Sequence, residues 1–123
     1  MTGFTDRELD VMAVLWPLES ATVAEVRAHI EDDLAYTTVL SILRILEEKG
    51  HVGHRGEGKA YRYFAMVGRE AAGESALARL KTKIFGGSAE LLMSQMVSDR
   101  DLSREQLERL RALMDERLGK KAP

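Results

Sequence analysis

An apolar helical pattern that leads directly into a glycine-rich hairpin pattern constrains the fold more than any other part of the sequence. Four apolar residues recur at the spacing of one helix face within residues 37–49: Val39, Ile42, Leu43 and Leu46. This spacing predicts a helix that buries one side in a core, and Gly50 is suited to end it. Residues 51–55 and 60–65 then read as two strands around a four-residue hairpin turn.

Two further helices are expected before this segment, because two capping-box sequences precede it. Thr5 and Thr22 are each followed three residues later by a glutamate. The hydroxyl and the carboxylate of such a pair can each satisfy a free amide of the first helical turn. Pro17 is expected to end the first helix. Three helices followed by a two-stranded hairpin is the order of a winged helix-turn-helix domain, which we assign to residues 1–67.

The side of the third helix opposite its apolar stripe carries short hydroxyl groups and a cation. In a helix-turn-helix, residues near the start of the second helix of the motif contact base edges, and flanking elements hold phosphates. The predicted DNA contacts are Thr37, Thr38, Ser41, Arg44, Arg55, Lys59 and Arg62. The alternative interpretation is an ordinary solvated face. Arg62 alternates with two tyrosines and can instead pair with an acidic residue on the sheet.

The charge of the chain permits DNA binding without requiring it. The net charge is −2, and residues 1–67 hold seven Lys and Arg against eleven Asp and Glu. The electrostatic footprint of a DNA-binding protein is local, however. Residues 34–67 hold five Lys and Arg against three Asp and Glu. The acidic balance of residues 1–67 supports a different class, a winged-helix module that binds another protein.

Residues 68–123 predict three more amphipathic helices, the last two beginning after Ser88 and Ser103. Their apolar faces cannot all be buried within one copy of so short a region, because small cores are marginal. We therefore expect a helical dimerisation domain. The predicted dimerisation residues are Leu77, Leu80, Ile84, Leu91, Leu92, Met96, Leu107, Leu110 and Met114. A dimer predicts an operator that is an inverted repeat.

Several classes of function lack their residue patterns. The chain has no cysteine, so a disulfide framework and a thiolate metal site are excluded. His51 and His54 lie three apart on a predicted strand and point to opposite faces, so no metal site is expected. The sequence shows no nucleophile–base pair and no phosphate-binding loop. We therefore expect a protein that is not an enzyme and that binds no cofactor. Without a signal peptide or a long apolar span, the protein is expected to be soluble and cytoplasmic, with no insertion into a membrane.

The chain contains, in order, the segments LDVMAVLW, TVAEV, LAYTTVL, ILEEKG, GKAYRY, FGGS and LSREQLERLRALM. In order and spacing these resemble the penicillinase-repressor family (BlaI/MecI type), over nearly the whole chain. The resemblance implies a mainly α protein that acts as a homodimeric repressor, with a winged helix on double-stranded operator DNA and C-terminal helices for dimerisation. It further implies control of β-lactamase or related envelope-stress genes. A regulator that binds a small effector is the alternative within this fold.

The resemblance also implies a mode of release. Family members are released when an antibiotic-sensing membrane metalloprotease triggers cleavage in the C-terminal region. That region corresponds here to LLMSQMVS, with Gln95–Met96 as the expected bond. Two departures stand out. Ile45 occupies a position that is often basic in the family, so a phosphate contact is missing there or is made by Arg44. The cysteine metal motif of the copper-responsive branch is absent.

Overall fold

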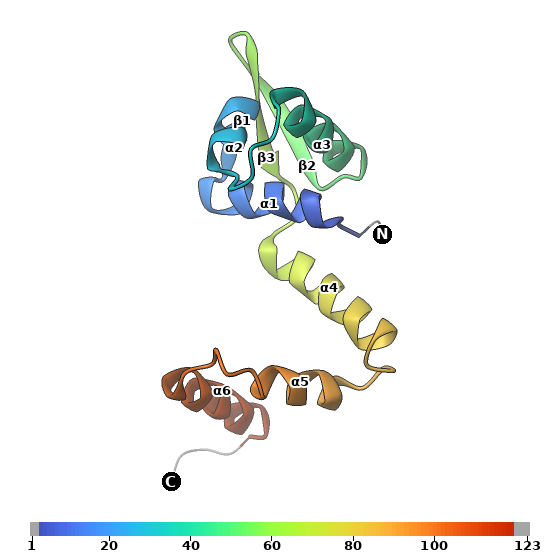
Figure 1. Ribbon diagram of the computed structural model, residues 1–123, viewed down its shortest axis with the longest axis vertical. Coiled ribbons are helices and arrows are strands. Elements are labelled where there is room, and N and C mark those ends of the chain that lie inside the picture. Colours follow the sequence, from blue (N-terminus) through green and yellow to red (C-terminus); the bar gives the residue numbers. More distant parts are fainter. Residues whose placement is uncertain (1–2, 120–123) are drawn as a thin grey trace. The chain divides into compact units, whose positions relative to one another are not determined.

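The structure is a computed structural model that describes residues 3–119, apart from the side chain of Glu57 (Figure 1). Contacts divide the chain into two compact units, Met1–Leu77 and Ala78–Pro123. The elements of the described residues are α1 (Asp6–Leu18), β1 (Ser20–Thr22), α2 (Val23–His29), α3 (Tyr36–Glu48), β2 (Val52–Glu57), β3 (Ala60–Ala65), α4 (Arg69–Lys83), α5 (Ala89–Val97) and α6 (Arg104–Arg117). Three helices followed by a two-stranded hairpin confirm the predicted winged helix-turn-helix order.

Both predicted capping boxes of the first unit are confirmed. The Thr5 hydroxyl accepts a hydrogen bond from the Glu8 amide at 3.1 Å, and the Glu8 carboxylate accepts one from the Thr5 amide at 2.9 Å. Thr22 and Glu25 make the same reciprocal pair at the start of α2. These side chains satisfy amides that have no partner within the helix, so they fix where α1 and α2 begin.

The end of α1 differs from the prediction. Pro17 lies inside the helix, which ends one residue later at Leu18, and Glu19 then adopts a positive φ of 68°. A proline in the last turn removes only one hydrogen bond and does not need to stop the helix at its own position. The chain reverses at Glu19 and enters β1, a three-residue strand that the sequence pattern did not reveal.

The sheet has the strand order β1-β3-β2, and both pairings are antiparallel. β1 pairs with β3 from Ser20↔Phe64 to Thr22↔Arg62. β2 pairs with β3 as far as Glu57↔Ala60, so the hairpin turn has two residues rather than the expected four. Gly58 has a φ of 61° in this turn, a conformation that glycine adopts without strain.

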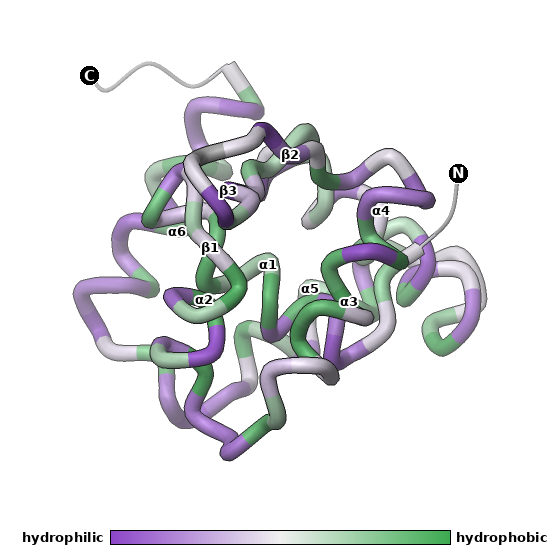
Figure 2. Tube along the Cα trace, turned by 90° about the horizontal axis from the view of Figure 1, so that it is seen from above, coloured by the Kyte–Doolittle hydropathy of each residue, from purple (hydrophilic) through white to green (hydrophobic). Residues whose placement is uncertain are grey.

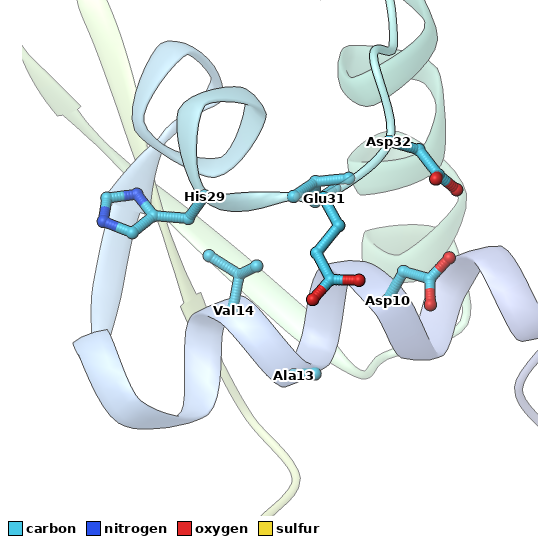
Figure 3. Close-up of a pocket in the computed structure, with 7 residues that line it drawn as sticks. Asp10, Ala13, Val14, His29, Glu31 and Asp32 are labelled. Atoms are coloured by element: carbon cyan, nitrogen blue, oxygen red, sulfur yellow. The ribbon is translucent and has the colours of Figure 1, made fainter.

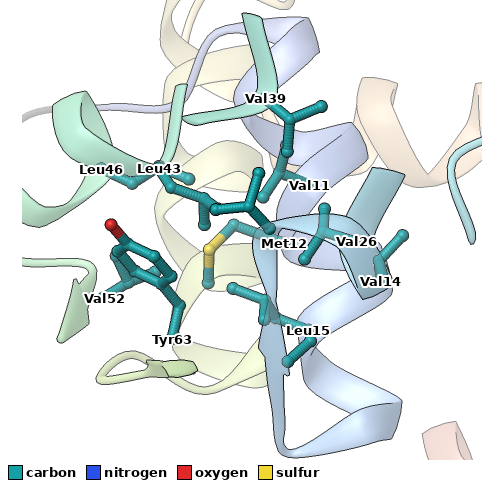
Figure 4. Close-up of a cluster of buried hydrophobic side chains, with 12 residues drawn as sticks. Val11, Met12, Val14, Leu15, Val26, Val39, Leu43, Leu46, Val52 and Tyr63 are labelled. Atoms are coloured by element: carbon teal, nitrogen blue, oxygen red, sulfur yellow. The ribbon is translucent and has the colours of Figure 1, made fainter. Parts of the chain in front are cut away.

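The core of the first unit lies between the three helices and the sheet (Figure 4). Figure 2 shows apolar segments along α1 and α3, the two helices that supply most of this core. Three of the four apolar residues predicted to face the core from α3 are fully buried, and Ile42 is partly buried. The buried residues of the cluster are Val11, Met12, Val14, Leu15, Ala21, Val23, Val26, Val39, Leu43, Leu46, Val52 and Tyr63.

The second unit contains the end of α4 together with α5 and α6. Ser88 caps α5 by accepting a hydrogen bond from the Leu91 amide at 3.1 Å. Ser103 and Gln106 form the predicted capping box of α6. None of the described residues from 78 to 119 is buried. None of the described helices is long and apolar enough to cross a membrane.

Candidate nucleic-acid interface

The outward side of α3 carries the residues that the sequence predicted to contact bases. Thr37, Thr38, Ser41 and Arg44 are all exposed, while the opposite side of the helix lies in the core. No side chain caps the start of α3, since Ala35 occupies the N-cap position. The first turn therefore presents short hydroxyl side chains and uncapped amides together, both of which can donate to a nucleic acid.

Ile45 lies on the same outward side and is 45% exposed. Arg44, next to it, is the cation of this face. An aliphatic side chain cannot hold a phosphate, so positive charge near this side of α3 comes from Arg44 and from the neighbouring hairpin, while the exposed Glu48 adds a negative charge.

The hairpin of β2 and β3 forms the wing, defined here as residues 52–65. Arg55 and Lys59 are exposed, on β2 and in the turn respectively. Neither side chain is part of the buried core. The wing thus brings two of its three predicted contacts to the surface.

The third predicted wing contact, Arg62, has a structural partner. Its Nη2 donates to Glu25 Oε1 at 2.9 Å, and its Nη1 lies 3.3 Å from the carbonyl oxygen of Ser20. The Thr22 amide and hydroxyl, followed by Arg62, hold the pKa of Glu25 below its ordinary value although desolvation opposes them. Of the two roles that the sequence left open for Arg62, ion pairing is present among the described side chains, with Glu25 on α2 as an acidic partner.

A short polar contact between side chains joins the wing to α3. His54 Nδ1 on β2 lies 2.6 Å from Glu47 Oε2 on α3. The ring of His54 also packs on Tyr61 and Tyr63 of β3, with centroids 4.5 and 5.6 Å away. Burial raises the pKa of Tyr63, and the carboxylate of Glu47 raises it further.

A partly buried ion pair that the sequence did not reveal lies at the same, C-terminal end of α3. Lys49 Nζ lies 2.8 and 2.9 Å from the two carboxylate oxygens of Glu8 on α1. Glu8 is buried, and next to this pair His51 stacks on Phe4 with ring centroids 4.1 Å apart. The capping-box sequence predicted only the hydrogen bonds of Glu8 with Thr5, not its ion pair with Lys49. The pair fixes the C-terminal end of α3 against α1.

A hollow of about 300 Å³ between α1 and the α2–α3 loop is lined by acidic groups (Figure 3). Asp10, Glu31 and Asp32 contribute carboxylates to it. Arg7 donates to Asp32 at 2.7 Å and to Asp10 at 3.2 Å. Carboxylates repel the negatively charged phosphates of DNA, so we do not include this surface in the candidate interface.

The predicted dimerisation residues lie on α4, α5 and α6 or, for Ile84, directly after α4. Leu92 and Leu110 are half-buried, and the others are exposed. Gln95 and Met96, the expected cleavage residues, lie in the last turn of α5 and are both exposed.

Three helices, a twisted sheet and a cationic wing beside an outward polar helix face define a winged helix-turn-helix protein. Within that class, the profile of the penicillinase repressors matches residues 4–116. The chain belongs to the penicillinase repressor family, as its sequence motifs predicted, and this is a family of transcriptional repressors rather than of enzymes.

Relatives and a solved structure agree with this assignment. The chain is 21% identical over 112 residues to the methicillin resistance regulatory protein MecI of Staphylococcus aureus, covering 89% of this chain and 91% of MecI. It is 23% identical over 119 residues to the penicillinase repressor of Bacillus licheniformis, covering 95% and 93%. The solution structure of the DNA-binding domain of the repressor BlaI matches with 27% identity and a TM-score of 0.51, covering 55% of this chain and 85% of that domain.

Proposed function

We propose that the protein is a homodimeric repressor that binds a double-stranded operator with the inverted symmetry of its dimer. The observation that carries this proposal is the outward polar face of α3 beside the cationic wing. This face occurs in a domain whose solved relative is the DNA-binding domain of a repressor. We call α3 the reading helix from here on.

The residues divide into two roles by their chemistry. Thr37, Thr38 and Ser41 have short side chains that let the reading helix approach base edges in the major groove. Arg55 and Lys59 on the wing carry exposed positive charges, and the donors of a guanidinium and of an ammonium both suit phosphate oxygens. Arg44 can contact either a base edge or a phosphate. Arg62 acts mainly by pairing with Glu25, which holds the wing on α2.

The exposed apolar residues of the second unit support dimerisation through it. No described residue from 78 to 119 is buried, although this part carries large apolar side chains such as Ile84, Leu91 and Met96. A monomer would leave this apolar surface in water, and a surface of this kind marks an interface. A second copy of the same helices, related by twofold symmetry, is the occupant that the proposal assigns. We propose residues 1–67 as the DNA-binding domain and residues 68–123 as the dimerisation domain, with the start of α4, up to Leu77, belonging to the compact unit of the winged helix.

The regulated genes are inferred from the names of the relatives, and the release step from the family resemblance. MecI is named for methicillin resistance and the Bacillus licheniformis protein for penicillinase. We propose that this chain represses β-lactamase or related envelope-stress genes. We expect it to act in the cytoplasm. A membrane metalloprotease that senses the antibiotic would trigger cleavage at Gln95–Met96.

An electrophoretic mobility shift across a salt series tests the proposal. The full-length protein is titrated onto the DNA upstream of its own gene and onto an unrelated duplex of equal length. The proposal predicts a specific complex that weakens steeply with salt, as counterions are released from the phosphates. A winged-helix module that binds only protein would shift neither duplex at any salt concentration, and that result would refute the proposal.

A further inference from the structure

The wing has little support beyond its base. β1 pairs with β3 only as far as Thr22↔Arg62, and from there to the turn the ribbon consists of β2 and β3 alone. Figure 1 shows this part of the hairpin projecting past the helices of the first unit. A two-stranded ribbon is marginally stable and can bend, so the position of Lys59 at its turn depends on what holds the ribbon lower down.

Glu47 and His54 form the contact that lies at this point. His54 stands opposite Tyr63 in the strand register, and its ring packs on Tyr61, the residue beyond Arg62 toward the turn. Through the 2.6 Å bond to Glu47, this aromatic side of the ribbon is fixed to the reading helix. Arg62 and Glu25 fix the other face of the ribbon to α2.

A purely structural role does not account for the pair. Both side chains are 35% exposed. Ion pairs and hydrogen bonds at this degree of exposure contribute little to the stability of a fold. Glu47 also places a negative charge on the helix that is proposed to approach a polyanion, and this charge by itself opposes binding.

We propose that Glu47 and His54 are positioning residues that set the angle between the wing and the reading helix, so that phosphate contacts and base contacts are made together. This inference rests on the proposed DNA-binding function. It assigns neither residue a contact with DNA. Lys59 meets its phosphate only when the ribbon is held by Glu47.

Removal of either residue tests the proposal, because electrostatics and positioning predict opposite signs for Glu47. The probe is a duplex selected from a randomised pool by the full-length wild-type protein. Loss of a carboxylate would by itself strengthen binding to DNA. A positioning role predicts that Glu47→Ala and His54→Ala both weaken binding, by roughly fivefold or more. Both should also reduce the slope of log Kd against log salt by about 0.9, the amount that corresponds to one lost phosphate contact.

Three comparisons separate positioning from general damage. Glu47→Gln keeps a group that can bond to the imidazole and should bind within about twofold of the wild type. His29→Ala and Glu31→Ala remove the same residue types elsewhere in the first unit and should leave the salt slope unchanged. Lys59→Ala should weaken the wild type but add little to His54→Ala, because the contact is already lost.

The outcomes distinguish this inference from the function on which it rests. If the randomised pool yields no enriched duplex, the DNA-binding function itself fails. If a duplex is enriched but Glu47→Ala binds it more tightly, or the effects of His54→Ala and Lys59→Ala simply add, the positioning role is wrong. Should circular dichroism show that His54→Ala does not fold, Glu47→Ala compared with Glu47→Gln decides the question.

Discussion

The indole Nε1 of Trp16 donates a hydrogen bond to the carbonyl oxygen of Val67 at 2.9 Å, and so joins α1 to the end of the segment that precedes α4. The guanidinium of Arg69 lies 5.5 Å from the centre of the same indole ring. Ala72, one turn further along α4, is buried. The first turns of α4 therefore pack on the winged helix, in agreement with a compact unit that extends to Leu77.

A fragment of residues 1–77 should accordingly be more stable than one of residues 1–67. The shorter fragment loses the burial of Ala72 and the cation–π contact of Arg69, together worth about 1–2 kcal/mol of unfolding free energy. Urea denaturation followed by the fluorescence of Trp16, the chain's one tryptophan, measures both fragments directly. Equal midpoints and slopes would mean that the start of α4 contributes nothing to the fold.

The Glu8–Lys49 pair makes stability depend on acid pH. Burial raises the pKa of Glu8, but hydrogen bonds from Lys49 and Thr5 outweigh it, so the pKa lies below its ordinary value of 4.5. A lowered carboxyl pKa stabilises the fold above about pH 4.5, and this contribution is lost as the pH falls through the folded-state pKa. Glu8→Gln should cost about 1–3 kcal/mol at pH 7, because it leaves the Lys49 ammonium without its carboxylate.

The measurement is the free energy of unfolding of wild type and Glu8→Gln between pH 7 and pH 3. The difference in unfolding free energy between the two proteins should narrow as the pH falls below about 4.5, since only the wild type has a carboxylate at position 8 that is protonated there. A difference that stays constant over this range would show that the pair does not carry the pH dependence.

Substitutions on the reading helix and on the wing should affect binding differently. Thr38→Ala and Ser41→Ala should relax base preference, at about 1–3 kcal/mol for the base pair each one contacts. Lys59→Ala should weaken binding to all sequences alike, because phosphate contacts carry no sequence information. Affinities for a panel of single-base-pair variants of the bound duplex measure both effects. A uniform loss for every variant protein would contradict the assignment of α3 as the reading helix.

Cleavage in α5 should release the repressor from DNA. α5 has nine residues and no buried side chain, so it can open locally and present an extended backbone to a protease. A cut at Gln95–Met96 would detach α6 and remove part of the dimer interface. Mass spectrometry of the protein from cells treated with a β-lactam should detect the fragment that ends at Gln95. Full-length protein that leaves the operator uncut would rule out this mechanism.

Features encoded locally were predictable from the sequence. Thr5, Thr22, Ser88 and Ser103 cap helices through residues three positions away, so a short window contains the whole interaction. The apolar spacing of α3 likewise determined which of its sides lies in the core. The outward placement of Thr37 followed from that spacing alone.

Features that depend on distant residues were not predictable. β1 has three residues and no pattern of its own, and it is a strand only because β3 pairs with it. Glu8 and Lys49 are separated by 41 positions, and Arg62 finds Glu25 across 37. Each of these contacts depends on tertiary packing. The periodicity of the sequence therefore could not distinguish a Lys or Arg that pairs within the fold from one that stays exposed on the surface.

We propose that two copies of this chain read the two halves of one DNA site. Selecting duplexes from a randomised pool with the full-length protein and sequencing the bound fraction tests this directly. We expect an inverted repeat whose half-site centres lie about one or two helical turns apart. Enrichment of a single unrepeated half-site would contradict the dimeric reading, and no enrichment at low salt would contradict DNA binding by this chain altogether.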